Sequence, residues 1–102
     1  MADWFVKNKI RDDKVTVFIK PTCSYCRNMM EILTQFNIRP DCLESVDITG
    51  RDDVQDYLQQ TTGQRTVPCV FIGKNCIGGL SDLQNLYRQL PGMLRQIHAL
   101  QQ

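Results

Sequence analysis

The sequence lacks any long hydrophobic run and has little excess of either charge. No stretch is long enough to span a bilayer, and the opening segment MADWFVKNKIRDDK interrupts its apolar residues with Asp3, Lys7 and Lys9, unlike a signal peptide. A cytoplasmic location is therefore the default expectation. The formal net charge of +1 provides no general attraction for nucleic acid. We expect neither a membrane nor a nucleic-acid partner.

Internal repeats, linkers and low-complexity tracts are also missing. The chain has 102 residues, 42% of them hydrophobic and 23% charged, which is the composition of an ordinary globular protein with room for one core. We predict a single domain over residues 1–102.

Histidine is scarce, with one residue, whereas cysteine is present five times. An odd count and no export signal disfavour a disulfide framework and favour reduced thiols with one special pair. That pair is Cys23 and Cys26, in the segment KPTCSYC. A zinc site is one alternative, but it needs four ligands, and Cys42, Cys69 and Cys76 stand alone in the sequence. Two buried thiols without a chemical role are the other alternative.

The spacing of apolar residues predicts alternating strands and helices. A β-branched strand at 14–20 precedes an amphipathic helix from Ser24 to about Asn37, and a second strand follows at 42–48. Because these two strands are joined by a helix, they are expected to be parallel with a right-handed crossover. The next helix has Asp52 or Asp53 as its candidate cap and Gly63 as its stop.

The second half of the chain predicts a hairpin and closing helices. The hairpin turns at Gly73-Lys74-Asn75, and its antiparallel strands should join the same sheet. Ser81 and Gln84 have the spacing of a capping box, and Tyr87 falls on an apolar stripe expected in the core. Pro91-Gly92 predicts a break before a short last helix, and a weaker helix is expected at the start of the chain. Together these elements predict a three-layer α/β sandwich.

The predicted helix start determines the chemistry expected of the cysteine pair. Cys23 would lie at the helix N-terminus, where free backbone N–H groups and the helix dipole favour a thiolate, with Lys20 and Arg27 adding positive charge. Cys26, one turn later on the inward stripe, would be the resolving thiol. Their separation allows a disulfide with little backbone movement, so the pair is expected to cycle between dithiol and disulfide.

The segments KPTCSYC, TVP and GG.SD, in this order, resemble a dithiol glutaredoxin of the short vertebrate cytosolic type. The similarity runs over essentially the whole chain. It implies a thioredoxin-like three-layer sandwich with a central mixed four-stranded sheet flanked by helices. Thioredoxin itself fits less well, because its motif has tryptophan before the first cysteine, where this chain has Thr22.

The resemblance implies a glutathione-dependent oxidoreductase. Such enzymes reduce mixed disulfides between proteins and glutathione, as well as other disulfides, with glutathione as the electron donor. Cys23 would take up the glutathionyl group, and Cys26 would matter mainly for protein disulfides. Glutathione and disulfide-containing proteins are the expected partners, and a monomer without an obligatory metal is the expected state.

A glutathione groove is also implied by the resemblance. The backbone of Val67 would pair with the cysteinyl part of glutathione, and Pro68 matches the family's cis-proline. Ser81 and Asp82 match the residues that hold the γ-glutamyl end, although both are also ordinary N-capping residues. The complete implied set is Lys20, Tyr25, Gln55, Arg65, Thr66, Val67, Pro68, Ser81 and Asp82.

One departure from the family pattern opens an alternative. Ser24 stands where proline is common, and in some relatives this change accompanies a [2Fe-2S] cluster that two subunits share through their active-site cysteines and two glutathiones. Under this alternative, Cys23 would be a cluster ligand in a dimeric redox sensor or cluster carrier. Cys69 stands where arginine is common, and Cys42 and Cys76 have no assigned role.

Overall fold

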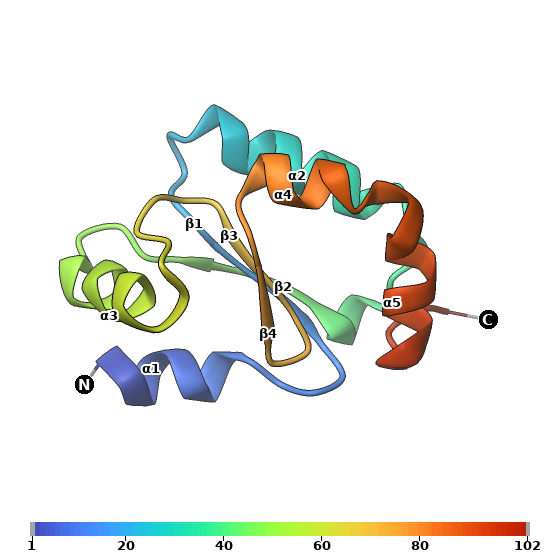
Figure 1. Ribbon diagram of the computed structural model, residues 1–102, viewed down its shortest axis with the longest axis horizontal. Coiled ribbons are helices and arrows are strands. Elements are labelled where there is room, and N and C mark those ends of the chain that lie inside the picture. Colours follow the sequence, from blue (N-terminus) through green and yellow to red (C-terminus); the bar gives the residue numbers. More distant parts are fainter. Residues whose placement is uncertain (1, 102) are drawn as a thin grey trace.

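The computed structural model describes residues 2–101, and its four strands form one mixed sheet in the order β2-β1-β3-β4 (Figure 1). The strands β1 (Val15–Ile19) and β2 (Leu43–Asp47) are parallel. The strands β3 (Cys69–Ile72) and β4 (Asn75–Gly78) form the hairpin, and β3 is antiparallel to β1. The predicted mixed four-stranded sheet is confirmed.

Helices cover both faces of this sheet, which confirms the predicted three layers (Figure 1). On one face lie α2 (Ser24–Thr34) and α4 (Leu80–Asn85), and on the other lie α1 (Ala2–Lys9) and α3 (Asp52–Thr62). The last helix, α5 (Leu90–Gln96), lies at the end of the molecule that also holds the C-terminus.

The core follows from the alternation of side chains along the strands. In β1, Val15 and Val17 belong to the apolar cluster under α2 and α4, and Phe18 belongs to the cluster under α1 and α3. Phe18 packs edge-on against Phe71, with ring centroids 5.8 Å apart. Each such side chain contributes about 1.5–3 kcal/mol when it is fully buried. The sheet is therefore stabilised from both faces, which makes it a rigid support for the segments at its ends.

The register of β1 and β3 brings two distant segments together. Phe18 pairs with Cys69 in this antiparallel ladder, so the residues that follow β1 lie beside the residues that precede β3. The segment that follows β1 leads to Cys23, and the segment that precedes β3 contains Val67 and Pro68. This meeting point is where the candidate site lies.

The predicted helix caps are wrong in two places. The N-cap of α3 is Arg51 without a side-chain cap, and its guanidinium instead holds the Asp53 carboxylate at 3.0 Å. The N-cap of α4 is Gly79, whose N–H donates to Asp82 Oδ2 at 2.9 Å, so the capping box does not use Ser81. In both cases a residue starts the helix one or two positions earlier than the sequence pattern predicts.

The predicted break at Pro91 and the predicted burial of Tyr87 are also wrong. Pro91 lies in the first turn of α5, directly after the 3-10 turn η2 (Tyr87–Gln89). Backbone N–H groups in a first turn make no hydrogen bond within the helix, so a proline there removes none. Tyr87 is 44% exposed, and its hydroxyl donates to Gln35 Oε1 at 2.7 Å. The sole tryptophan, Trp4 on α1, is 68% exposed.

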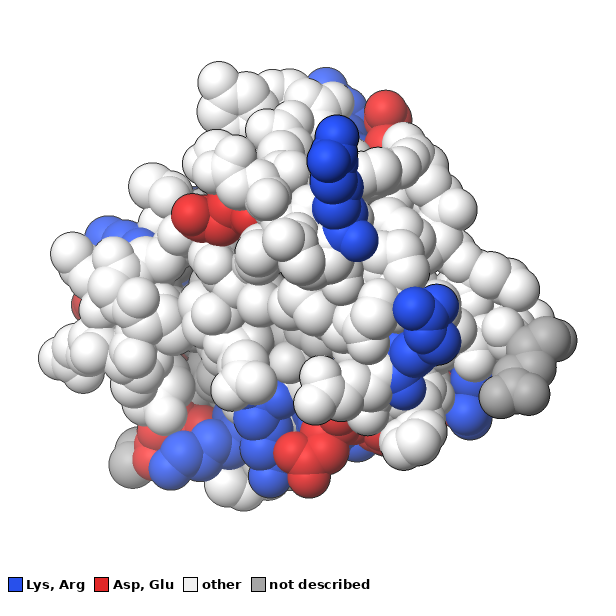
Figure 2. Space-filling view, turned by 45° about the vertical axis from the view of Figure 1, so that its right-hand side comes forward, with Lys and Arg blue, Asp and Glu red and all other residues white. Residues whose placement is uncertain are grey.

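Charged side chains of both signs are interspersed on the face in Figure 2, where they gather along the lower edge. This mixture agrees with the formal net charge of +1. Within residues 2–101, none of the helices combines the length and the apolar character that a membrane crossing requires.

Lys14 and Glu44 form the most buried ion pair of the sheet, and we predict that it makes stability depend on pH. Lys14 is 6% exposed, and its Nζ lies 2.6 Å from Glu44 Oε1, which holds the pKa of Glu44 below its ordinary value. A lowered carboxylate pKa stabilises the fold above about pH 4.3, and this contribution is lost as the pH falls through the lowered value. Because the Glu44 side chain is 39% exposed, we expect solvent screening to limit the pH-dependent part to about 1 kcal/mol.

Urea unfolding of Lys14→Met at pH 7 and pH 3 measures this contribution. The free-energy gap between the original chain and the variant should shrink at pH 3. Lys74→Met, in the exposed hairpin turn, is the control and should show no such change. An equal gap at both pH values would contradict the role of the Glu44 carboxylate.

Candidate functional site

Cys23 occupies the N-cap position of α2. Its backbone is extended, with φ −91° and ψ 115°, and its Sγ accepts a hydrogen bond from the backbone N–H of Cys26 at 3.1 Å. The sulfur therefore lies at the positive end of the helix, where backbone N–H groups lack intrahelical partners. It is partly exposed, so a reagent can reach it.

Cys26 lies one turn later in a different environment. Its side chain is 3% exposed, and burial, followed by its hydrogen bond with Cys23, raises its pKa to about 12. At neutral pH this thiol is therefore protonated. The two cysteines differ as an attacking thiol and a resolving thiol are expected to differ.

Val67 lies on the other side of the Cys23 sulfur. The Cys23 thiol donates to the carbonyl oxygen of Val67 at an Sγ–O distance of 3.8 Å, and the Val67-Pro68 peptide bond is cis. Among residues 2–101, the backbone N–H of Val67 makes no hydrogen bond within the chain. An extended peptide can pair with this short edge of backbone beside the sulfur.

A groove of about 600 Å³ begins at this edge. Tyr25 and Asn28 of α2 line one side, and Ser81 and Asp82 in the first turn of α4 line the other. The remaining lining residues are Gln64, Thr66, Val67, Pro68, Gly79, Leu80 and Gln84.

Gln64 is a residue of the groove that sequence reasoning missed. Its Nε2 donates to the carbonyl oxygens of Thr66 at 3.2 Å and Pro68 at 3.0 Å. The same amide approaches Gly79, where an added Cβ would lie 2.9 Å from Nε2. Gln64 therefore lies between the Thr66–Pro68 segment, to which it is hydrogen-bonded, and Gly79 at the start of α4, which its amide approaches. Nothing in its sequence spacing separates it from the neighbouring glutamines.

Two glycines allow the Asp82 carboxylate to approach the backbone. Gly78 has φ +121°, and a Cβ there would lie 2.3 Å from Asp82 Oδ2. The N–H of Gly79 donates to this same oxygen. The position of the Asp82 carboxylate at the end of the groove therefore depends on the absence of a side chain at Gly78.

Three of the predicted binding residues do not line this groove. Lys20 lines a neighbouring hollow of about 280 Å³, together with Cys26. Gln55 is buried, with 9% of its surface accessible, and donates to the carbonyl oxygen of Arg65 at 3.2 Å. Arg65 forms an ion pair with Asp56. Gln55 therefore supports the loop before Thr66 from within the protein.

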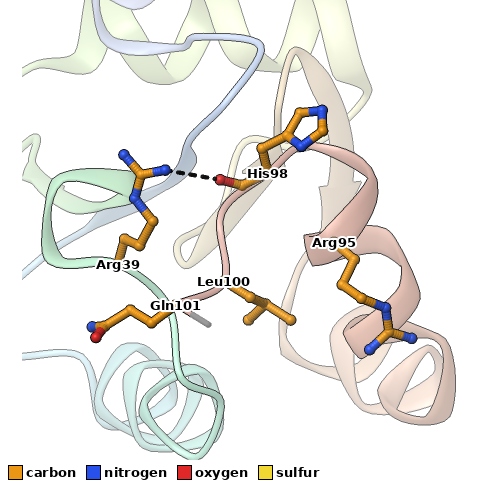
Figure 3. Close-up of a pocket in the computed structure, with 5 residues that line it drawn as sticks. All are labelled: Arg39, Arg95, His98, Leu100 and Gln101. Carbon is orange, nitrogen blue, oxygen red and sulfur yellow. Dashed lines mark hydrogen bonds between the residues drawn. The ribbon is translucent and has the colours of Figure 1, made fainter.

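Another hollow, of about 750 Å³, is lined by Arg39, Arg95, His98, Leu100 and Gln101 (Figure 3). Arg39 points toward His98 and donates to its carbonyl oxygen at 3.4 Å, whereas the Arg95 guanidinium is directed away from both (Figure 3). No cysteine lines this hollow. The groove of about 600 Å³ includes Val67, whose carbonyl oxygen lies 3.8 Å from the Cys23 sulfur, and this contact makes it the candidate site.

The arrangement at Cys23 is suited to thiol-disulfide exchange. A sulfur at a helix N-terminus is an effective nucleophile toward a disulfide, and a second thiol one turn away can displace a bound group. The peptide edge and the Asp82 carboxylate would select the molecule attached to the attacked sulfur.

Comparisons with known proteins identify similar chains. A model of the glutaredoxin family matches residues 15–77. Glutaredoxin-1 of Gallus gallus is 64% identical over 100 residues, covering 98% of this chain and 99% of that protein. Glutaredoxin-1 of Homo sapiens is 58% identical over 106 residues, covering 99% of this chain and 100% of that protein. The crystal structure of a buckwheat glutaredoxin-glutathione complex superimposes with a TM-score of 0.87 at 31% identity, covering 99% of this chain and 94% of that chain.

Proposed function

Because the chain belongs to the glutaredoxin family and is a thiol-disulfide oxidoreductase, we propose that its reductant is glutathione and its nucleophile is Cys23. The observation that carries this proposal is the position of the Cys23 sulfur, 3.1 Å from the N–H of Cys26 and 3.8 Å from the carbonyl oxygen of Val67, at the edge of the groove. The structural similarity to a glutaredoxin-glutathione complex supports glutathione as the molecule in that groove.

In the first step, the Cys23 thiolate attacks the glutathionyl sulfur of a protein mixed disulfide. The Cys23–glutathione bond forms, the bond to the substrate protein breaks, and the substrate leaves as a thiolate that takes a proton from water. The helix N-terminus, including the N–H of Cys26, stabilises negative charge on the Cys23 sulfur before the attack and after its release.

In the second step, the thiolate of another glutathione attacks the glutathionyl sulfur on Cys23. Glutathione disulfide forms, and Cys23 leaves as a thiolate. The buried Cys26 takes part when the substrate is a protein disulfide. It loses its proton, attacks Cys23, and releases the second substrate thiol as the Cys23–Cys26 disulfide forms.

The groove residues orient the glutathionyl group. The free N–H and the carbonyl of Val67 pair with its cysteinyl portion, beside Thr66 and Pro68, and Tyr25 shields the sulfur. Ser81 and Asp82 hold the γ-glutamyl end, the first through backbone N–H groups and the second through its carboxylate. The glycyl carboxylate lies toward Lys20 and Arg65, while Gln55 of α3 holds the carbonyl oxygen of Arg65 and so positions the loop before Thr66.

Under the [2Fe-2S] alternative, one chain would supply Cys23 as a ligand. No group of three or more His, Cys, Asp or Glu residues within 2–101 is arranged to hold a metal. A cluster at Cys23 would therefore need ligands from a second chain and from glutathione. The thiol chemistry uses the residues of one chain, and we propose a monomer in a reducing compartment such as the cytoplasm.

Asp82→Asn tests the proposed function at the γ-glutamyl end. Asparagine keeps an acceptor for the N–H of Gly79 but loses the charge that would pair with the glutathione ammonium. The loss of one charge-assisted hydrogen bond costs about 1.5–3 kcal/mol, so we expect KM for glutathione to rise about tenfold or more, with kcat little changed. The assay is turnover of a glutathionylated substrate with glutathione as the only reductant.

Asp52→Asn, in the exposed first turn of α3, is the matched control and should leave both parameters unchanged. An unaltered KM in Asp82→Asn would show that the γ-glutamyl end lies elsewhere. Turnover by the original chain with thioredoxin reductase as the electron source, but not with glutathione, would overturn the proposed reductant.

A further inference from the structure

Two thiols outside the groove lie in contact. Cys69 begins β3 and Cys76 lies on β4, and their sulfur atoms are 3.8 Å apart on the face of the sheet covered by α1 and α3. The two strands are hydrogen-bonded neighbours, with an irregularity in their register between Val70 and Phe71. The sheet therefore keeps the two sulfurs close together, whereas Cys42 has no such neighbour among the described cysteines.

The two thiols differ in access. Cys69 is fully buried, and Cys76 is partly exposed at a hollow of about 290 Å³. Lys7 of α1 and Lys74 of the hairpin turn line this hollow together with Thr61. A small disulfide that carries carboxylates can therefore reach Cys76 and be attracted to the two ammonium groups. It cannot reach Cys69 without passing Cys76 or opening the core.

The two thiols also differ in their chemistry. The contact with Cys69, with smaller contributions from Thr62 and the backbone of Gly78, lowers the pKa of Cys76 to about 7, although burial and, to a lesser extent, the Asp82 charge oppose this effect. The same contact and then burial raise the pKa of Cys69. Ionisation is therefore favoured at the accessible thiol and disfavoured at its buried neighbour, which can donate a hydrogen bond to the Cys76 thiolate.

We propose that Cys76 and Cys69 form a second redox-active dithiol, in which Cys76 attacks glutathione disulfide and Cys69 resolves the product into an intramolecular disulfide. This inference goes beyond the proposed function and uses neither Cys23 nor Cys26. Cys76 pairs with Phe71 in the ladder, so Cys69 is its diagonal neighbour. The 3.8 Å contact must close to about 2.05 Å, which requires side-chain rotation and a shift within the hairpin.

The reaction takes place in two exchanges. The Cys76 thiolate attacks one sulfur of glutathione disulfide, a Cys76–glutathione bond forms, and glutathione thiolate leaves. Cys69 then gives up its proton to that thiolate or to water and attacks Cys76 Sγ, and the second glutathione leaves. In total, two protein thiols lose two electrons and two protons, and one glutathione disulfide becomes two glutathione molecules.

A variant with Cys23→Ser, Cys26→Ser and Cys42→Ser retains only Cys69 and Cys76 and isolates the proposed reaction. After incubation with glutathione disulfide and acid quenching, its intact mass should fall by two hydrogens. Peptide mapping should show a Cys69–Cys76 bond, and titration should show the loss of both thiols. In the same background, Cys69→Ala should stop at one bound glutathionyl group, and Cys76→Ala should leave Cys69 unmodified.

Two results would overturn the proposal. The first is that the folded variant keeps both thiols free after an incubation with glutathione disulfide that is long enough to oxidise the same chain unfolded in urea. The second is a lasting mixed disulfide on Cys76 while Cys69 is present. If the variant fails to fold, as judged by circular dichroism, the same mapping on the original chain decides between these outcomes. A failure of glutathione-dependent turnover at Cys23 would leave the result unaffected.

Discussion

Replacement of Cys23 by serine is expected to abolish turnover of a glutathionylated substrate, with a loss on the order of 10⁴-fold or more. The serine hydroxyl remains protonated at neutral pH, and oxygen is a poor nucleophile toward a disulfide sulfur. The partly exposed sulfur at the N-cap of α2 has no substitute in the groove, because Cys26 is buried and its pKa is raised to about 12. The measurement is the initial rate of glutathione-dependent release of the substrate thiol.

Cys26→Ser is the matched control for this prediction. It should retain most of the turnover of a glutathione mixed disulfide, because both steps occur at the Cys23 sulfur. It should lose the reduction of protein disulfides, which requires a resolving thiol within the chain. Equal losses in the two variants would refute the division of roles between the two cysteines.

Gly78→Ala, just before the residues of α4 that line the groove, is expected to have the largest effect of any glycine-to-alanine change near the site. The backbone at Gly78 has φ +121°, and the new Cβ would lie 2.3 Å from Asp82 Oδ2. A backbone conformation of this kind costs about 1–3 kcal/mol for a residue with a side chain, and the overlap must also displace the Asp82 carboxylate. We expect urea unfolding to show a loss of about 2 kcal/mol or more, and glutathione titration to show an increased KM.

Gly50→Ala is the control that separates the free-energy cost of a positive φ from the cost of steric overlap with Asp82. Gly50 has φ +75°, but a Cβ there has no atom within 4 Å. The Gly50→Ala variant should lose about 1 kcal/mol of unfolding free energy, and its KM for glutathione should be unchanged. If Gly78→Ala matches Gly50→Ala in both measurements, then the close approach of Asp82 to the Gly78 backbone has no consequence for the groove.

Much of the fold was predictable because its strong signals are local. The β-branched run before Pro21 and the glycine in the hairpin turn determine β1 and the β3-β4 hairpin, and helical spacing after Ser24 determines α2. These three elements already place Cys23 at a helix N-terminus at one end of the sheet. The expectation that free backbone N–H groups lie beside its sulfur needed no information on distant residues.

The parts that sequence reasoning missed depend on where side chains point within loops and strands, even between residues that are close in the sequence. Arg51 and Gly79 precede the first turns of their helices, and each bonds to the carboxylate of an aspartate in that turn, Asp53 and Asp82. Gln64 is distinguished from other glutamines only by the two carbonyl oxygens that its amide reaches. The contact between Cys69 and Cys76 depends on strand register, which spacing along the chain does not show.

The position of Trp4 has a practical consequence for spectroscopy. The only indole of the chain is on α1, is 68% exposed, and lies on the face of the sheet opposite α2. We therefore expect the emission of a water-exposed indole. Its intensity and wavelength should not change when Cys23 is oxidised, because the sheet lies between the two residues. An optical reporter of the sulfur chemistry would instead be an indole introduced at Tyr25, which lines the groove.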